Sequence, residues 1–141
     1  MKKILVLTSI YPGPDIPKYF TPVVHYFAKE WVASGVEVKV IHNIAYYPRF
    51  FYWISYFFSK LISSIIGTNI PAKRLVRDHL YKYENVQVYR YPIFKLFPQY
   101  KFTEKNLIKQ KLKITRELKR DNFDPDYIVG HWWNPQLELI Q

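Results

Sequence analysis

Two short apolar runs with an amphipathic segment between them constrain the fold of this chain more than any other feature. Residues 4–8 (ILVLT) and 36–41 (VEVKVI) are typical of strands buried on both faces of a sheet. Between them, residues 20–34 place apolar side chains at three- and four-residue spacings, as one face of a helix does: Val24, Phe27, Ala28, Trp31 and Val32. Gly35 is well placed to end that helix. The order strand, helix, strand predicts a right-handed unit with two parallel strands.

The second half of the chain repeats this order. Residues 86–91 (VQVYRY) and 127–130 (YIVG) are strand-like, and residues 103–120 predict a basic helix with one apolar side: Leu107, Ile108, Leu112, Ile114 and Leu118. Thr103 is suited to cap that helix, and Asn134 with Pro135 has the form of an N-cap and first position of another. We predict an α/β fold, a Rossmann-like parallel sheet flanked by helices, as a single, incomplete domain over residues 1–141.

Composition and charge narrow the partners. The chain is 49% hydrophobic and 19% aromatic, which suits a folded domain, and it has no cysteine for a disulfide or a nucleophile. Its formal net charge is +10, and residues 60–120 hold fifteen basic against four acidic residues. Such a surface fits nucleic acid, an anionic membrane or plain solvent. Because no RNP-type motif interleaves charges with aromatics, we expect no nucleic-acid partner. The opening MKKILVLTSIYPGP has the short basic start of a signal peptide, but its apolar run is too brief and it lacks a small-residue cleavage site. The absence of cysteine fits a reducing compartment, so we expect a cytoplasmic location.

The ends of the predicted strands carry the residues best suited to bind a ligand. In a parallel α/β sheet, ligands bind beyond the carboxyl ends of the strands. We expect His42 and Asn43 at the end of the second strand and His131 at the end of the last one. His131 could hydrogen-bond a hydroxyl or a phosphate, or transfer a proton. The adjacent Trp132, Trp133 and Asn134 are candidates for substrate binding, with the tryptophans as stacking surface or as core filler.

The loop after the first strand is a weaker candidate. Pro12, Gly13 and Pro14 make a rigid turn before a helix whose N-terminus could receive an anion, although a structural loop explains them as well. The chain has no G-x-G-x-x-G sequence and no Walker A sequence, and no spacing typical of metal ligands. We therefore predict no metal site and no bound cofactor. Of the other histidines, we expect His25 on the helix surface and His79 in solvent.

Both ends of the chain resemble one family. The opening MKKILVLTSIYPGPDIPKYFTPVVHYFAKEWVASGVEVKVIHN is similar to the start of GT-B glycosyltransferases of the retaining family 4 type, with a Ser-x-Tyr-Pro loop after the first strand and a Gly-x-Glu-Val turn. The stretch FDPDYIVGHWWNP resembles that family's fourth-strand region, which ends in a histidine. Residues 44–102 match only in character.

The resemblance implies an enzyme that moves a sugar from a nucleotide-sugar donor to a glycan or lipid-linked acceptor in surface polysaccharide or glycolipid synthesis. Two Rossmann-like domains would face a cleft, and the N-terminal one would mainly receive the acceptor. Carried onto this chain, Pro12, Gly13 and Pro14 would approach the donor diphosphate, and His131 would contact the donor sugar as the catalytic histidine. Many members have two glycines in that loop, whereas this chain has one.

Length is the main departure from the family pattern. A complete enzyme needs a C-terminal donor-binding domain with a basic residue for the diphosphate and a Glu-x7-Glu signature. We therefore expect this chain to be a fragment that requires the missing domain and is inactive alone. The alternative is a non-catalytic α/β module that binds an anionic membrane surface or a protein partner.

The aromatic segment over residues 49–67 fits either function. On a helix its polar residues make one narrow stripe against a broad apolar surface, and the segment is too short to favour a bilayer span. It could lie on an anionic membrane, peripherally at the inner face, with Phe51, Trp53, Phe57 and Lys60 at the surface. It could equally cover the sheet as an ordinary core helix.

Overall fold

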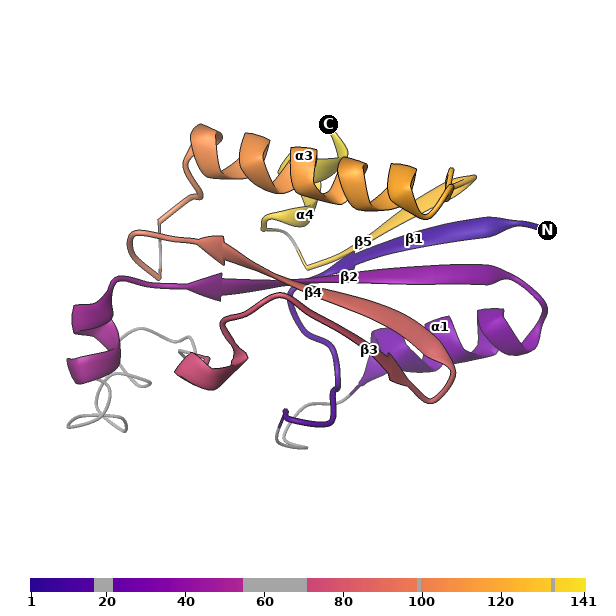
Figure 1. Cartoon of the computed structure of the whole chain (residues 1–141), viewed down its shortest axis with the longest axis horizontal. Coiled ribbons are helices and arrows are strands. Elements are labelled where there is room, and N and C mark those ends of the chain that lie inside the picture. Colours follow the sequence, from indigo (N-terminus) through magenta and orange to yellow (C-terminus); the bar gives the residue numbers. More distant parts are fainter. Residues whose placement is uncertain (17–21, 55–70, 99, 133) are drawn as a thin grey trace.

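The computed structural model describes residues 1–16, 22–54, 71–98, 100–132 and 134–141. The elements in order are β1 (Lys3–Thr8), α1 (Val23–Ala33), β2 (Glu37–Tyr46), η1 (Lys73–Leu75), β3 (His79–Tyr83), β4 (Val86–Phe94), α3 (Glu104–Arg120), β5 (Tyr127–His131) and α4 (Gln136–Ile140). Helices and strands follow one another along the chain, except that β3 runs directly into β4, as Figure 1 shows.

The strands form one five-stranded sheet in the order β3-β4-β2-β1-β5. β4, β2, β1 and β5 are parallel, and β3 pairs with β4 in the antiparallel direction. α1 lies against one face of the sheet, and α3 and α4 lie against the other (Figure 1). The chain proceeds from β1 through β2 to β4 and then returns to place β5 on the far side of β1. This is a doubly wound, Rossmann-like α/β fold, as predicted.

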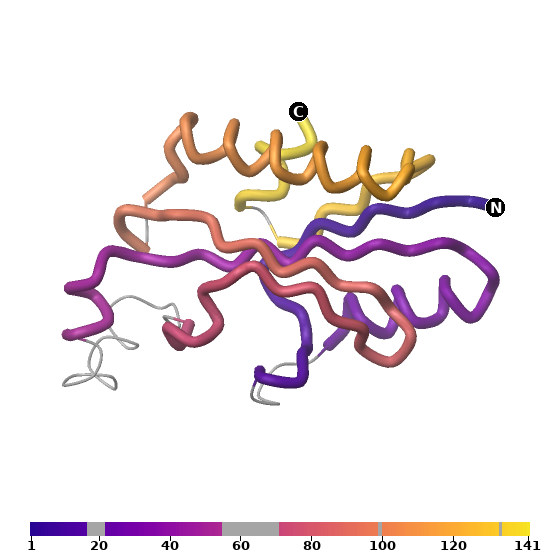
Figure 2. The backbone as a smooth tube through the Cα atoms, in the orientation of Figure 1, coloured from indigo at the N-terminus to yellow at the C-terminus, as the bar shows by residue number. Residues whose placement is uncertain are grey.

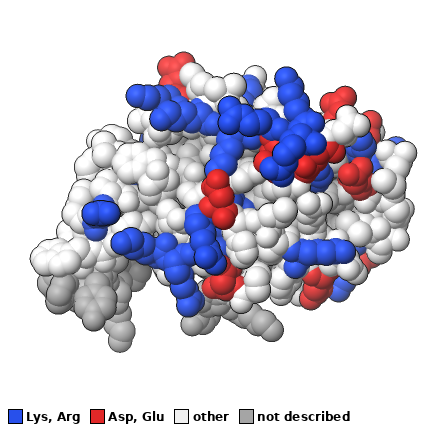
Figure 3. All heavy atoms as spheres, in the orientation of Figure 1, with Lys and Arg blue, Asp and Glu red and all other residues white. Residues whose placement is uncertain are grey.

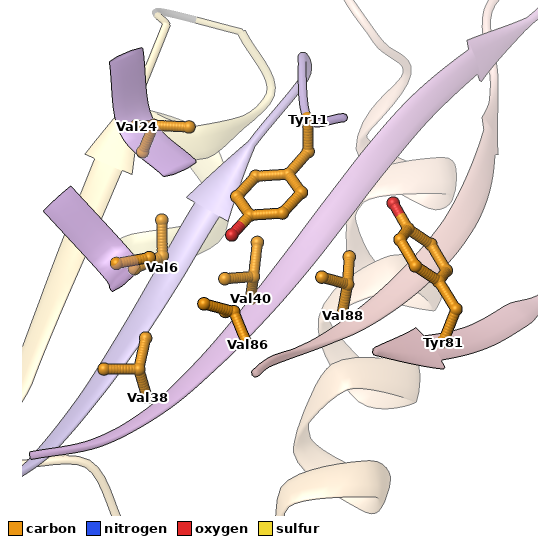
Figure 4. Close-up of a cluster of buried hydrophobic side chains, with 9 residues drawn as sticks. Val6, Tyr11, Val24, Val38, Val40, Tyr81, Val86 and Val88 are labelled. Carbon is orange, nitrogen blue, oxygen red and sulfur yellow. The ribbon is translucent and has the colours of Figure 1, made fainter. Parts of the chain in front are cut away.

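The alternation of side chains along the inner strands explains why their sequences are apolar on both faces. One face packs against α1 through a cluster rich in valine, part of which Figure 4 labels: Val6, Tyr11, Val24, Val38, Val40, Tyr81, Val86 and Val88. The other face packs against α3 through a second cluster: Leu5, Leu7, Ile41, Tyr89, Tyr91, Ile114, Phe123 and Leu139. Leu5, Val6 and Leu7 are therefore all buried, although they alternate between the two faces.

The strands differ from the prediction in length and number. β2 continues to Tyr46 and β4 to Phe94, so both extend beyond the end of β1. β3 was not predicted, because its sequence HLYKY carries polar residues and gains its strand form by pairing with β4. Glu84 and Asn85 join these two strands with φ angles of 42° and 71°. Two residues at positive φ are typical of the tightest hairpin turns, but Glu-Asn is not their usual sequence.

The buried faces of the two long helices differ from the prediction at individual positions. In α1, Val24 and Ala28 are buried as predicted, with Trp31 and Val32 packed against the same core. His25 is buried and Phe27 is exposed, which reverses the expectation for these two residues. The cause lies outside the helix, because the buried Tyr11 hydroxyl bonds His25 at 2.9 Å. In α3, Thr103 caps the helix as predicted, whereas Ile108 and Leu112 are exposed: Gln110 and Ile114 occupy the buried face, with Leu107 and Leu118 partly buried against the core.

Candidate functional site

A row of polar residues crosses the whole sheet near the carboxyl ends of β1 and β5. One residue from each strand contributes, and each is the register partner of its neighbour: His79, Arg90, His42, Thr8 and His131. By the alternation of strand side chains, the row lies on the face that α1 covers. One end of the row lies where β1 and β5 pair, at their carboxyl ends. The order of strands reverses between these two strands, and doubly wound proteins bind ligands at such a point.

Thr8 and His131 are joined at this edge. Thr8 Oγ1 lies 3.1 Å from His131 Nδ1, and the same oxygen donates to the carbonyl of Ile10 at 2.9 Å and accepts from the Ile10 N–H at 3.2 Å. Thr8 is fully buried, whereas His131 is partly exposed. Partial burial lowers the pKa of His131, which favours the neutral imidazole. The structure thus places His131 at the end of β5, as predicted.

Trp132 flanks this histidine on the solvent side. Its ring meets that of His131 edge-on, with 5.6 Å between centroids, and it is 56% exposed. Its φ of 72° is in the left-handed region, which turns the chain sharply after β5. Trp133 lies outside the described residues. A substrate-binding role for either tryptophan stays a prediction.

The loop that holds Pro12, Gly13 and Pro14 is anchored on β3 and β4. The Tyr81 hydroxyl donates to the Pro12 carbonyl at 2.9 Å. A Cβ on Gly13 would lie 3.0 Å from Arg90 Nη2 and 3.1 Å from the Tyr81 hydroxyl. Close packing against these two side chains therefore accounts for the glycine, and contact with a diphosphate stays a prediction.

Arg90 holds the end of this loop through an ion pair. Its guanidinium is fully buried and donates to both carboxylate oxygens of Asp15, at 2.8 and 2.7 Å. These hydrogen bonds lower the pKa of Asp15 to about 2. His79 lies on the same carboxylate, with Nδ1 at 3.9 Å, and is partly buried in β3, so its predicted position in solvent was wrong. Arg90 gave no sequence signal, because it is a lone charge in a strand and its partner is far away in the chain.

His42 belongs to the row but is not at the end of its strand. The prediction of a strand end was wrong, because β2 continues to Tyr46. His42 is buried, and its Nε2 lies 3.2 Å from the Ser9 carbonyl oxygen. Burial, and then the charge of Arg90, lower the pKa of His42 to about 4, so the ring is neutral near pH 7. A substrate contact for His42 stays a prediction.

A chain of buried amides supports the site from the opposite face of the sheet. Gln110 Nε2 donates to Asn43 Oδ1 at 2.7 Å, and Asn43 Nδ2 donates to Gln136 Oε1 at 3.1 Å. Gln136 Nε2 then donates to the Ser9 hydroxyl at 2.7 Å and lies 3.2 Å from the His131 carbonyl. Both ends of the Asn43 amide are therefore occupied within the protein. Neither glutamine was predicted, because neither belongs to a recognisable motif.

Asn134 closes the turn between β5 and α4. Its carbonyl accepts a 3.0 Å hydrogen bond from the Ser9 hydroxyl. The predicted capping role was wrong by one position, because α4 begins at Gln136 and Pro135 occupies the N-cap. The Asn134–Pro135 peptide bond is cis. The Asn134 backbone therefore helps to hold the site, and a substrate contact of its side chain stays a prediction.

An aromatic patch lies at the same end of the sheet as the site. The segment just after β2 and the loop after β4 form it, and both are at the left end of Figure 2. We define the aromatic patch as the exposed residues Phe50, Trp53, Leu96, Phe97 and Tyr100. Phe51 lies beneath this patch, with its ring 4.2 Å from Phe50 and 5.8 Å from Phe97 between centroids.

The predicted membrane-facing residues have different outcomes. Phe51 is only 9% exposed, so its predicted place at a membrane surface was wrong, whereas Trp53 is 68% exposed. Phe57 and Lys60 lie outside the described residues. Within the described ranges, no helix is long and apolar enough to cross a membrane.

Other features of the described residues do not add a site. These residues contain no group of three or more His, Cys, Asp or Glu placed to hold a metal ion. A groove of about 550 Å³ lies near the start of β2, lined by the end of α1 and by the β3–β4 hairpin, so it is at the amino end of the sheet.

Comparisons with known proteins add no family to this description. No protein-family model, curated protein or solved structure matches the chain. The fold class follows from the topology of the sheet, and a fold class does not by itself imply a function.

Proposed function

We propose that the chain is the acceptor-side, N-terminal domain of a GT-B glycosyltransferase, which transfers a sugar from a nucleotide-sugar donor to a glycan or lipid-linked acceptor. The observation that carries the proposal is the position of His131. Its imidazole stands at the carboxyl end of β5 and bonds Thr8 at the end of β1, beside the point where strand order reverses. In the retaining family 4 type of GT-B glycosyltransferase that the chain resembles, a histidine at this position contacts the donor sugar.

The surroundings of His131 support a role in positioning a ligand. The Thr8 hydroxyl contacts Nδ1 of the His131 ring, and the Gln136 amide donates to the backbone carbonyl of His131. Ser9 is fixed between Gln136 and the turn that follows β5. A side chain held by buried partners on a rigid sheet can orient a substrate more precisely than one on a loose loop. Trp132, exposed beside His131, offers an aromatic ring whose face is suited to stack on a sugar ring.

Ligand-observed NMR with the purified chain tests this proposal. A panel of nucleotide sugars would be compared with the matching nucleoside diphosphates by saturation transfer. Because the resemblance assigns most donor contacts to a C-terminal domain, we expect only weak binding by this chain, detected at millimolar ligand. We expect saturation transfer to the sugar protons of at least one donor, lost in His131→Ala and retained in Lys109→Ala, which changes an exposed residue of α3. The absence of any transfer to sugar protons, or equal transfer in His131→Ala, would contradict the proposal.

We also propose that the aromatic patch rests on an anionic membrane, which would bring a lipid-linked acceptor to the site. The patch has basic neighbours in sequence, and on the face shown in Figure 3 this left end displays uncharged and basic side chains. Apolar burial and attraction to anionic lipid would add, at about 1 kcal/mol per Lys or Arg near the surface. The same observation favours the second candidate, a non-catalytic membrane-surface module.

Vesicle co-sedimentation tests the membrane proposal. We expect binding to anionic vesicles that weakens with salt and with Phe97→Ser, and that persists in Tyr26→Ser, which changes an exposed aromatic of α1. Binding that ignores both lipid charge and salt would oppose the proposal. Vesicle binding without sugar transfer signals in the NMR experiment would favour the non-catalytic module.

A further inference from the structure

We infer that Thr8 fixes His131 in the tautomer whose proton is on Nδ1, so that the site presents a lone pair on Nε2 and takes a hydroxyl group rather than a phosphate. Thr8 is then a positioning residue that acts through His131. The tautomer follows from the geometry alone. The nature of the ligand group rests on the proposed function.

The hydroxyl of Thr8 has one proton and two lone pairs, and its neighbours account for all three. The carbonyl oxygen of Ile10 has no proton, so the 2.9 Å contact between the two oxygens requires the Thr8 proton. The N–H of Ile10 uses one lone pair. Towards His131 Nδ1, at 3.1 Å, Thr8 Oγ1 can therefore act only as an acceptor.

The proton of the neutral His131 ring must then lie on Nδ1. A neutral imidazole carries one N–H, so Nε2 keeps an unshared pair of electrons. Partial burial favours this neutral form by lowering the pKa of His131. Because His131 ends β5 at the ligand edge of the sheet, this pair is available to a ligand that donates a hydrogen bond.

An unprotonated Nε2 distinguishes between ligand groups. A sugar hydroxyl can donate to it, whereas the oxygens of a fully ionised phosphate are acceptors and would face another acceptor. In a nucleotide sugar, the sugar rather than the diphosphate should therefore lie against His131. Of the two groups that the sequence allowed as partners of His131, a hydroxyl and a phosphate, the tautomer favours the hydroxyl.

His42 provides a comparison inside the same protein. Its Nε2 faces the carbonyl of Ser9 at 3.2 Å, and a carbonyl oxygen can only accept. The neutral His42 ring must therefore carry its proton on Nε2. His42 and His131 are both register partners of Thr8, one on each side of β1. We expect these two histidines to show opposite tautomers.

Nitrogen NMR of the unliganded full chain tests the tautomer. Long-range ¹H–¹⁵N correlation spectra of histidine-labelled protein at neutral pH distinguish protonated from bare ring nitrogens, and His131→Gln and His42→Gln spectra assign the signals. We expect protonated Nδ1 in His131 and protonated Nε2 in His42. Thr8→Val should move His131 towards the other tautomer, while Thr8→Ser, which keeps the hydroxyl, should not.

Two results would overturn the inference about Thr8. One is a wild-type His131 protonated on Nε2. The other is an unchanged His131 tautomer in a Thr8→Val protein whose remaining histidine signals show that it is folded. If Thr8→Val does not fold, the wild-type tautomer and the Thr8→Ser spectrum still decide the question.

A titration with two probes tests the ligand group. Neutral methyl hexosides and dimethyl phosphate, whose oxygens carry no proton at neutral pH, would be added separately, with the ¹⁵N shift of His131 Nε2 as the readout. We expect a shift with at least one hexoside and none with dimethyl phosphate. A shift with dimethyl phosphate alone, or with neither probe, would overturn the ligand assignment and leave the tautomer result standing. Failure of this ligand assignment is distinguishable from failure of the proposed function, because the proposed function is tested separately by nucleotide-sugar binding.

Discussion

Replacing Asp15 with Asn should destabilise the protein by about 3 kcal/mol. The change removes the charge that faces Arg90, a fully buried guanidinium, and leaves one amide oxygen where two carboxylate oxygens accept hydrogen bonds. The drop in the pKa of Asp15 from 3.8 to about 2 corresponds to about 2 kcal/mol, at about 1.4 kcal/mol per pKa unit. The rest is the cost of a buried charge without its partner, and breaking such pairs costs about 3–5 kcal/mol. Because the Asp15 side chain is 24% exposed, we expect the lower end.

Urea unfolding followed by far-ultraviolet circular dichroism at pH 7 measures this effect. Asp124→Asn, which changes an exposed carboxylate in the turn before β5, is the matched control and should stay within about 0.5 kcal/mol of wild type. The double variant Asp15→Asn/Arg90→Met removes both charges and should be more stable than Asp15→Asn, because an apolar replacement of a buried pair is often neutral.

The pH dependence gives an independent check on the same ion pair. A carboxyl group whose pKa is lowered by folding contributes stability above its unfolded pKa, and that contribution is lost as pH falls through the folded value. The advantage of wild type over Asp15→Asn should therefore shrink between about pH 4 and pH 2. An Asp15→Asn protein as stable as wild type at pH 7, or a double variant less stable than Asp15→Asn, would refute this reasoning.

Three further changes test other parts of the structure. Gly13→Ala should destabilise by about 1–3 kcal/mol, because its methyl group would press against the buried Arg90; chemical unfolding measures this, and an unchanged midpoint would contradict it. Thr103→Ala should cost about 1 kcal/mol through loss of the α3 cap, with Thr115→Ala on the exposed face as control; equal effects would rule out the cap. Asp121→Asn should remove part of the acid sensitivity between about pH 4 and pH 2, because hydrogen bonds from a buried lysine and a tyrosine lower the pKa of Asp121 to about 2; identical acid titrations would argue against this.

The sequence was sufficient for the parts of the fold that depend on local pattern. β1 lies between two strands and under helices on both faces, so its apolar run was easily assigned. The cap of α3 was also confirmed, because a threonine before a helix acts through its own neighbours. β3 could not be found in this way, since it depends on β4 rather than on its own composition.

Contacts between distant residues limited the prediction of helix faces and of the site. The buried position of His25 depends on Tyr11, and that of Gln110 depends on Asn43. Neither pairing has a signature in the helix itself, so the hydrophobic periodicity located most of each apolar face but missed its buried polar members. His131 could be located because the end of a strand is a local property. Its partner Thr8 is 123 residues away, and only the sheet register brings the two together.

A strand at the edge of a sheet also affects how a protein behaves in solution. Among the described strands, β5 is hydrogen-bonded on one side only, and its residues Tyr127 and Ile128 are exposed on opposite faces. Such an edge can pair with the same edge of another molecule. The net charge of +10 opposes that encounter, and added salt screens like charges. Self-association of this protein should therefore increase with ionic strength, whereas an assembly held by ion pairs would come apart.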